Sequence, residues 1–145
     1  MSHHAVRVVS LGNGIECKPS TLPDDAGFGL FATRPFKKGS IITWYDGERI
    51  SRNEALNRRK INKSSHIKSL NYLGDCIDGI KGESNMMIGR GGASLANDAR
   101  SFVRNNCSYV TKNNNIYLKA KRDLIEGEEL FVSYGKSYWS LRRLG

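Results

Sequence analysis

Cysteine is scarce in this 145-residue chain, with Cys17, Cys76 and Cys107 only, and no two of them are spaced as a CxxC pair. This scarcity argues against a structural zinc site, and the odd, scattered set predicts reduced thiols inside a cell. No run of about 18 apolar residues occurs, so no membrane-spanning helix is predicted. The first residues lack the apolar stretch of a secretory signal. We interpret His3–His4 as an inert terminus rather than a metal site.

Proline is also rare, with three residues, and no repeat, low-complexity segment or linker divides the chain. The length therefore predicts one domain. Acidic residues are outnumbered, with 14 Asp and Glu against 23 Lys and Arg, which leaves a net charge of +9. The imbalance is sharpest from Arg49 to Lys68, where seven basic residues accompany one acid. Such a stretch predicts either a solvated helix face or contacts to an anionic partner such as a nucleic-acid backbone.

Short apolar and β-branched runs, separated by turn residues, predict a fold that is mainly β. The expected strands cover 6–11, 27–32 and 41–47, short strands within 70–79, and a pair of strands joined by a hairpin tip at 113–115. Residues 81–92 are expected to form a loop.

Little helix is expected. Ser51–Arg52–Asn53–Glu54 has the pattern of a capping box, in which the serine hydroxyl and the glutamate carboxylate each accept from a backbone N–H of the first turn. It predicts a helix over residues 52–60 that ends in basic residues, which suit the negative end of the helix dipole. Helical turns are expected near 94–99 and 136–144.

The last third of the chain, residues 94–139, carries most of the polar motifs. Leu95–Asp98 and Asn105–Tyr109 are polar stretches, and residues 116–124 alternate between apolar and polar before a turn at Gly127. We interpret this region as two strands that deliver a buried Tyr134 to a site that Asn97 also reaches.

Six short motifs, each weak alone, follow one another along the chain: Gly27–Phe28–Gly29–Leu30–Phe31–Ala32, Tyr45–Asp46–Gly47–Glu48–Arg49–Ile50, Ile77–Asp78–Gly79, Asn97–Asp98, Asn106–Cys107–Ser108–Tyr109, and Gly127–Glu128–Glu129–Leu130 with Tyr134–Gly135. Together they resemble the SET domain of protein lysine methyltransferases over residues 6–139. The likeness is greatest to the minimal stand-alone forms, such as the small viral ones, because no zinc-binding cysteine clusters flank the motifs.

The resemblance implies a mainly β fold of small twisted sheets, with short helices and a knot-like core in which the C-terminal segment passes under an earlier loop. Residues 1–145 would form a single SET domain with a variable insert at about 51–90, and without pre-SET or post-SET zinc modules. Tyr134 and the Asn97 stretch would then lie side by side.

The resemblance also implies S-adenosyl-L-methionine as the methyl donor. Gly27, Phe28 and Gly29 would contact it through their backbone, with Asn97, Asp98 and Tyr134 completing the site. Trp139 would either stack on the adenine or plug the core. Asp98 stands where the family usually has histidine, which is tolerable if that position acts through its backbone and weakens cofactor binding if an imidazole is needed. No metal ligand is implied.

On the substrate side, the resemblance makes Tyr134 the catalytic tyrosine and Tyr45, Tyr109 and Val132 the residues lining the lysine channel. Methyl transfer needs a neutral amine, and removing the proton from a free lysine at pH 7 costs about 4.6 kcal/mol. An apolar channel lowers that cost by desolvation, and aromatic walls hold a cationic amine as well. Two channel tyrosines predict mono- or dimethylation. Glu128 and Glu129 are expected in strand-edge or ion-pair roles rather than in acid–base catalysis.

The expected partner is a protein with a target lysine, by default a histone tail, which would imply the nucleus. DNA or nucleosome contact through Arg49–Lys68, and a homodimer, remain open. Two further hypotheses are a methyltransferase of a non-histone protein and a catalytically weak SET-like peptide-binding module, the latter motivated by Asp98. A third, a basic nucleic-acid-binding β-domain, depends on charge alone.

Overall fold

A computed structural model describes residues 8–23, 27–62, 67–69, 76–79 and 88–134. Its elements in chain order are β1 (Val9–Gly12), β2 (Ile15–Pro19), β3 (Phe28–Ala32), β4 (Ile41–Trp44), β5 (Gly47–Ile50), α1 (Arg52–Asn62), β6 (Ile67–Ser69), β7 (Cys76–Gly79), the 3-10 helix η2 (Ala93–Leu95), β8 (Cys107–Lys112), β9 (Asn115–Ala120) and β10 (Glu129–Leu130). The predicted mainly β fold is confirmed. No helix in these ranges is long and apolar enough to cross a membrane.

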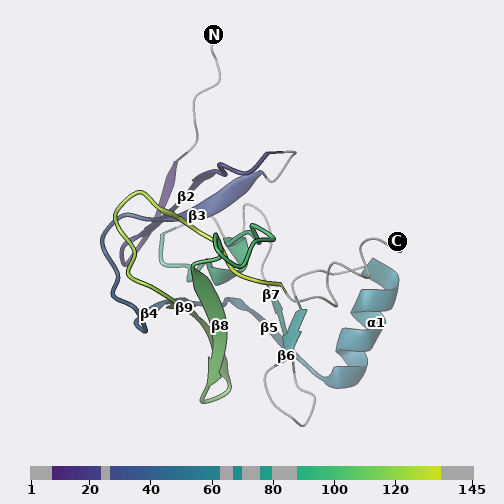
Figure 1. Cartoon of the computed structure of the whole chain (residues 1–145). Helices are drawn as coiled ribbons and strands as arrows, with labels where there is room; N and C mark the ends of the chain where they lie inside the picture. The colour runs from purple at the N-terminus through teal and green to yellow at the C-terminus, as the bar shows by residue number, and fades with distance from the viewer. Residues whose placement is uncertain (1–7, 24–26, 63–66, 70–75, 80–87, 135–145) are drawn as a thin grey trace.

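Within the described ranges the strands form small antiparallel sheets with the orders β1-β2-β3-β10, β4-β9-β8 and β5-β7-β6. Figure 1 shows the first sheet at the top, the β8–β9 hairpin below it, and α1 to one side beside β6 and β7. The main core lies between the first two sheets, because apolar residues alternate along strands of both. Its fully buried members include Leu11, Leu30, Leu118, Leu124, Leu130 and Val132.

The hairpin predicted around residues 113–115 is present. Strands β8 and β9 pair from Cys107↔Ala120 to Lys112↔Asn115, and Asn113 and Asn114 both have positive φ at the tip. Asparagine tolerates this left-handed conformation better than most residues, which explains the tip. Strand β2 was missed, although it is central in its sheet, because its five residues include two charges and end in a proline.

Helix α1 begins where the sequence predicted, and it continues two residues past the expected end, to Asn62. The Ser51 hydroxyl accepts from the Glu54 N–H at 3.1 Å, which confirms that half of the capping box. The Glu54 carboxylate instead accepts from Arg58 at 2.7 Å, one turn along the helix. That ion pair holds the carboxylate on the helix surface.

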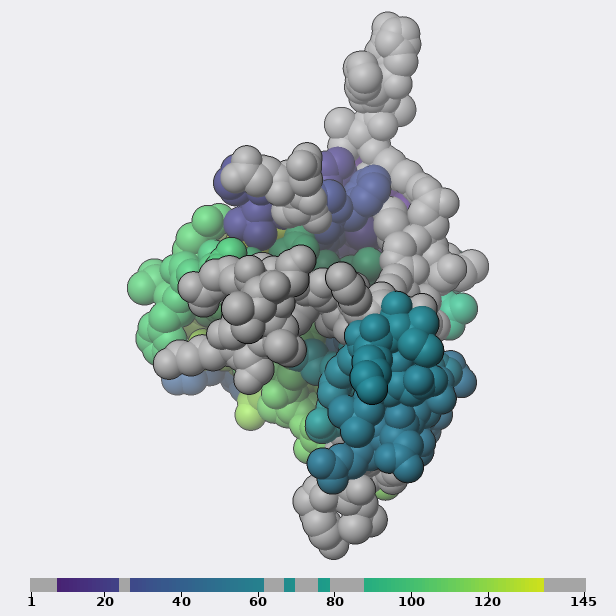
Figure 2. All heavy atoms as spheres, turned by 90° about the vertical axis from the view of Figure 1, so that its right-hand side faces the viewer, coloured from purple at the N-terminus to yellow at the C-terminus, as the bar shows by residue number. Residues whose placement is uncertain are grey.

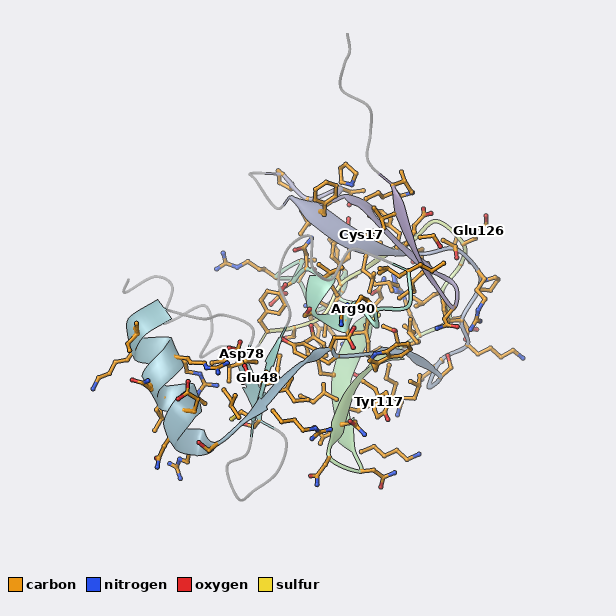
Figure 3. All side chains as sticks on the ribbon, turned by 180° about the vertical axis from the view of Figure 1, so that it is seen from behind. Cys17, Glu48, Asp78, Arg90, Tyr117 and Glu126 are labelled. Carbon is orange, nitrogen blue, oxygen red and sulfur yellow. The ribbon has the colours of Figure 1, made fainter. Side chains whose placement is uncertain are left out.

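Arg58 also joins α1 to the third sheet. Its guanidinium lies 2.9 Å from both the Glu48 and the Asp78 carboxylates, which Figure 3 labels side by side next to the helix. In Figure 2, α1 forms a raised teal lobe. Among residues 52–61, for which burial is described, only Ala55 is buried, in a small cluster with Ile50, Ile67 and Cys76. The helix therefore lies on the surface of the third sheet, held by few contacts.

Several expectations fall outside the described ranges. These are the strand start at residues 6–7, the segments 70–75 and 80–87, and the helical turn at 136–144. Near residue 94 a helical turn is present, but η2 ends at Leu95 because Ala96 has extended backbone, with φ −68° and ψ 131°. The three cysteines are buried, and none of them forms a disulfide.

Candidate active site

Residues 131–132 lie between two earlier parts of the chain, one at Asn97 and one at Cys107. Phe131 forms a parallel bridge with Asn97, and Val132 forms one with Cys107. The Val132 N–H donates to the Asn97 carbonyl at 2.9 Å, and the Cys107 N–H donates to the Phe131 carbonyl at 2.9 Å. The chain after β10 therefore runs between residue 97 and residue 107. This crossing agrees with the expected core and delivers Tyr134 beside the Asn97 stretch.

Asn106 holds this crossing together. Its side chain is 2% exposed; its Nδ2 donates to the Glu129 carbonyl at 2.9 Å, and its Oδ1 accepts from the Phe131 N–H at 2.8 Å. The Asn106 side-chain amide thus forms the two hydrogen bonds to residues 129 and 131 that the backbone of a neighbouring strand would otherwise form. The sequence placed Asn106 in a motif but assigned it no role, because an asparagine that binds a buried backbone cannot be told from a turn asparagine by type alone.

Tyr134 is half-buried, and its ring packs against the main core. Its hydroxyl donates to the Ala96 carbonyl at 2.6 Å. The phenol is therefore fixed in direction, and its oxygen keeps lone pairs that can accept a hydrogen bond. The expectation that Tyr134 and the Asn97 stretch lie side by side is met by this contact.

Asp98 fixes the backbone of the same tyrosine. Its Oδ2 accepts from the Tyr134 N–H at 2.9 Å, while its Oδ1 accepts from the Arg100 N–H at 2.7 Å and from Asn105 Nδ2 at 3.0 Å. The carboxylate is 8% exposed. The aspartate at this position thus acts through its side chain as an acceptor that joins three points of the chain, Arg100, Asn105 and Tyr134.

Tyr109 and Tyr45 stand next to Tyr134. Their rings meet edge to face, with centroids 5.5 Å apart and planes at 82°, and the Tyr109 hydroxyl donates to the Ala93 carbonyl at 2.9 Å. Burial is the main cause that raises the pKa of both phenols well above the ordinary value, and neighbouring tyrosines add to it. Both phenols stay protonated at neutral pH, so neither serves as a base.

The hydroxyls of Tyr109 and Tyr134 therefore both depend on the short 93–96 segment, and two glycines position that segment. The Gly91 N–H donates to Asp46 Oδ2 at 2.5 Å, and the Gly91 carbonyl accepts from the Thr43 hydroxyl at 2.6 Å. A Cβ on Gly91 would overlap the Trp44 carbonyl. Gly92 follows with φ +75° at the start of η2, a conformation that costs glycine little. The glycine pair thus lets the segment pass directly over β4.

On the other side of Asn97 lies the glycine-flanked phenylalanine. Asn97 Nδ2 donates to the Phe28 carbonyl at 3.0 Å, and a Cβ on Gly29 would overlap the Glu129 carboxylate. A Cβ on Gly27, where φ is +71°, would meet no atom within 4 Å. Phe28 and Gly29, two of the residues expected to contact the cofactor, thus adjoin Asn97, and the space at Gly27 is open. Within the described residues, Asn97 Oδ1 has no hydrogen-bond partner, so it offers an acceptor there.

Glu129 braces this side of the site. Its carboxylate is buried and accepts from the Ser20 hydroxyl at 2.7 Å and from the Thr21 N–H and hydroxyl at 2.8 and 2.7 Å. Glu128 lies on the surface, 3.4 Å from Arg122. These positions agree with strand-edge and ion-pair roles. Glu129 ties the loop after β2 to β10, and through Asn97 to the rest of the site.

A pocket of about 390 Å³ opens beside Tyr109 and Tyr134. Its described lining consists of Lys68, Cys107, Ser108, Tyr109, Lys121, Ser133 and Tyr134. The Lys68 ammonium lies 4.4 Å from the Tyr109 ring centroid and 5.9 Å from that of Tyr134. Sequence reasoning had grouped Lys68 with a basic surface; nothing in a charge count indicates that this side chain turns inward.

Other sequence-predicted residues have mixed positions. Val132 is buried in the core at 1% exposure and does not line this pocket, so its role in the channel stays a prediction. Tyr45 is absent from the pocket lining but contacts the Tyr109 ring, which lines it. Trp139 lies outside the described residues. Among the described residues, no three His, Cys, Asp or Glu side chains gather as a metal site would require.

Comparison with known proteins agrees with this geometry. A family model for the SET domain matches residues 27–135. The N-lysine methyltransferase KMT5A-A of Danio rerio is 28% identical over 116 residues, which cover 75% of this chain. The match spans 32% of that relative, so this chain corresponds to about a third of its length.

Proposed function

Since the chain belongs to the SET domain family, we propose that it is a protein-lysine N-methyltransferase that uses S-adenosyl-L-methionine. The observation that carries the proposal is the joint anchoring of Tyr109 and Tyr134 to the 93–96 segment, next to Asn97. The tyrosines proposed to contact the amine and the asparagine proposed to contact the methyl donor are thus positioned by the same segment of the chain. Bringing reactive groups to a set distance and angle is the main way to accelerate a displacement that needs no covalent intermediate.

The donor would lie against Gly27, Phe28, Gly29 and Asn97. The open space at Gly27 and the unpartnered Asn97 Oδ1 support this, since the methionine end of the donor carries an ammonium that can donate to such an acceptor. When bound, the donor supplies a methyl group activated on a sulfonium. The Glu129 carboxylate would hold Gly29 and the 20–21 loop in place rather than react.

The target lysine would enter the pocket beside Tyr109. A low-dielectric surround favours the neutral amine, and water takes the proton because the neighbouring phenols stay protonated. The Tyr134 oxygen would accept a hydrogen bond from the amine and orient its lone pair. Its own hydrogen is committed to Ala96, so the acceptor direction is set before substrate binds. Tyr45 and Tyr109 would leave room for one or two methyl groups.

The proposed substrate is a lysine in a histone tail, and the site of action would then be the nucleus. A non-histone protein is the alternative substrate.

Charge does not favour the nucleic-acid-binding hypothesis. Within Arg49–Lys68, Arg58 is paired with three carboxylates, the Arg49 guanidinium donates to Asn115, and Lys68 turns toward Tyr109. The hypothesis of a catalytically weak binding module was based on Asp98. Because the Asp98 carboxylate accepts from the Tyr134 N–H and so supports the proposed catalytic tyrosine, this residue no longer argues for lost catalysis.

Mass spectrometry of mixed core histones and of cell-extract proteins, after incubation with the enzyme and S-adenosyl-L-methionine, tests the proposal. We expect methylated lysine from the wild type and a loss of about 10²–10³-fold in rate for Tyr134→Phe, the range seen when one aligned hydrogen-bonding group is removed. Tyr117→Phe is the matched control, because Tyr117 is half-buried on β9 (Figure 3) and points to the opposite face of the hairpin from Tyr109. Absence of methylation in both mixtures, or equal rates for the two variants, would refute the proposal.

A further inference from the structure

Lys68 occupies the pocket that a substrate lysine would enter. It is the middle residue of β6, and successive strand residues point to opposite faces. Ile67 is buried at 8% in the cluster under α1, so Lys68 turns the other way. It lines the pocket together with Tyr109 and Tyr134. The register Lys68↔Ile77 fixes it there.

The surroundings of the Lys68 amine are those of a bound substrate amine. It lies over the Tyr109 ring at 4.4 Å and near the Tyr134 ring at 5.9 Å. No carboxylate of the described residues comes within 4 Å of its Nζ. Burial lowers its pKa, with the Asp98 charge opposing the change. Burial thus makes this amine easier to deprotonate than a solvated lysine, while the two aromatic rings hold its side chain in the pocket.

We propose that Lys68 is an internal substrate, which the chain methylates in cis at the pocket formed by Tyr109 and Tyr134. The inference rests on the proposed function, because it needs the same methyl donor. The Lys68 ammonium first gives one proton to water. Its nitrogen lone pair then forms the C–N bond while the bond from sulfur to the methyl carbon breaks, and that electron pair stays on sulfur, which becomes a neutral thioether.

Two consequences follow from this position. Lys68 competes with any outside lysine for the pocket, so a lysine-containing peptide should slow the internal reaction. Removal of the side chain should lower KM for such a peptide without lowering kcat, because only the competitor is lost.

The test incubates the full chain with S-adenosyl-L-methionine and no other protein, followed by peptide mapping. We expect methyl groups on Lys68, at a rate constant that does not change with protein concentration, as a reaction within one molecule requires. Lys112, an exposed lysine at the end of β8 that does not line the pocket, is the matched control. Lys112→Arg should leave the methylation of Lys68 intact, and Lys68→Arg should abolish the internal reaction. Methylation at another lysine, or a rate that rises with protein concentration, overturns the proposal.

A parallel incubation with mixed histones separates the two ideas. If histone lysines are methylated while Lys68 stays unmodified, the inference fails and the proposed function stands. If neither is methylated, the proposed function itself fails.

A readout that needs no donor uses limiting acetic anhydride as a chemical probe of each lysine across pH. Among the described residues, the titratable and charged groups facing Lys68 are Tyr109, Tyr134, Cys107 and Lys121 on the pocket wall, with Asp98 acting by its charge. We expect a labelling midpoint for Lys68 below the reference of about 10.4, and slower labelling when a lysine peptide competes for the pocket. A midpoint at the reference value, with no effect of the peptide, means a solvated lysine and overturns the inference.

Discussion

The Asp98 carboxylate offers the sharpest test of how this chain supports its tyrosine. It accepts from the Tyr134 and Arg100 N–H groups and from Asn105 Nδ2. Asp98→Asn keeps the shape but replaces one oxygen by an NH₂ group, so at least one donor then faces another donor. Asp98→His restores the residue type that is usual in the family, yet a neutral imidazole has a single acceptor nitrogen for three donors.

The magnitude follows from the contacts. A hydrogen bond to a charged acceptor contributes about 1.5–3 kcal/mol, and a buried donor left unsatisfied costs a further 1–3 kcal/mol or so. We therefore expect Asp98→Asn to lower the free energy of unfolding by about 2–4 kcal/mol and Asp98→His by more. At about 2–4 °C per kcal/mol for a domain near this size, the asparagine variant should melt roughly 4–16 °C lower.

Urea denaturation followed by circular dichroism measures both variants at neutral pH. Asp123→Asn is the control, because this exposed carboxylate accepts from the Lys38 N–H on the surface, and its loss should stay within about 0.5 kcal/mol. A wild-type midpoint for Asp98→Asn would refute the reasoning, as would a histidine variant more stable than the natural chain. Either result would mean that the Tyr134 backbone is held by something other than this carboxylate.

Two further predictions concern the neighbouring residues. Gly29→Ala places a methyl group into the Glu129 carboxylate and beside Asn97. We expect the free energy of unfolding, measured by urea denaturation, to fall by about 1–3 kcal/mol. Calorimetry should show weaker binding of S-adenosyl-L-methionine, and unchanged values in both measurements would show that Glu129 moves freely. Burial raises the pKa of the Cys107 thiol to about 12. As the pH rises, the unfolded chain therefore loses this proton before the folded chain does. Between about pH 9 and 12 the free energy of unfolding should fall by up to about 1.4 kcal/mol per pH unit more than in Cys107→Val. Denaturation at several pH values detects or excludes this difference.

Local patterns predicted much of this fold because they act over a few residues. Ser51 starts a helix since its hydroxyl reaches an N–H within one turn, and Asn113 and Asn114 turn a hairpin since they tolerate positive φ. The order of the motifs from Gly27 to Tyr134 was enough to identify the family. Strand β2 was missed because its two charges and its proline hide the apolar pattern of a strand, while its place between β1 and β3 is set only by pairing.

The roles of Lys68, Asn106 and Glu129 could not be predicted in the same way. Lys68 belongs to a basic stretch along the chain, yet strand alternation and its register with β7 turn it toward Tyr109. Asn106 and Glu129 bind groups that lie 23 to 25 and 108 to 109 residues away. The role of such a polar residue depends on the group with which it forms a hydrogen bond, and only folding brings that group close to it.

The sequence by itself determined the class of the fold, the places where strands turn, and the chemistry of the tyrosine- and glycine-containing motifs, because these depend on residue type and on short spacing. Only the tertiary structure decided that Tyr109 and Tyr134 are anchored to one segment, that Asp98 holds the Tyr134 backbone, and that Lys68 enters the pocket. The physical reason is that hydrogen bonds and burial act over a few ångströms in space, and the chain brings such groups together only when residues 131–132 pass between residue 97 and residue 107.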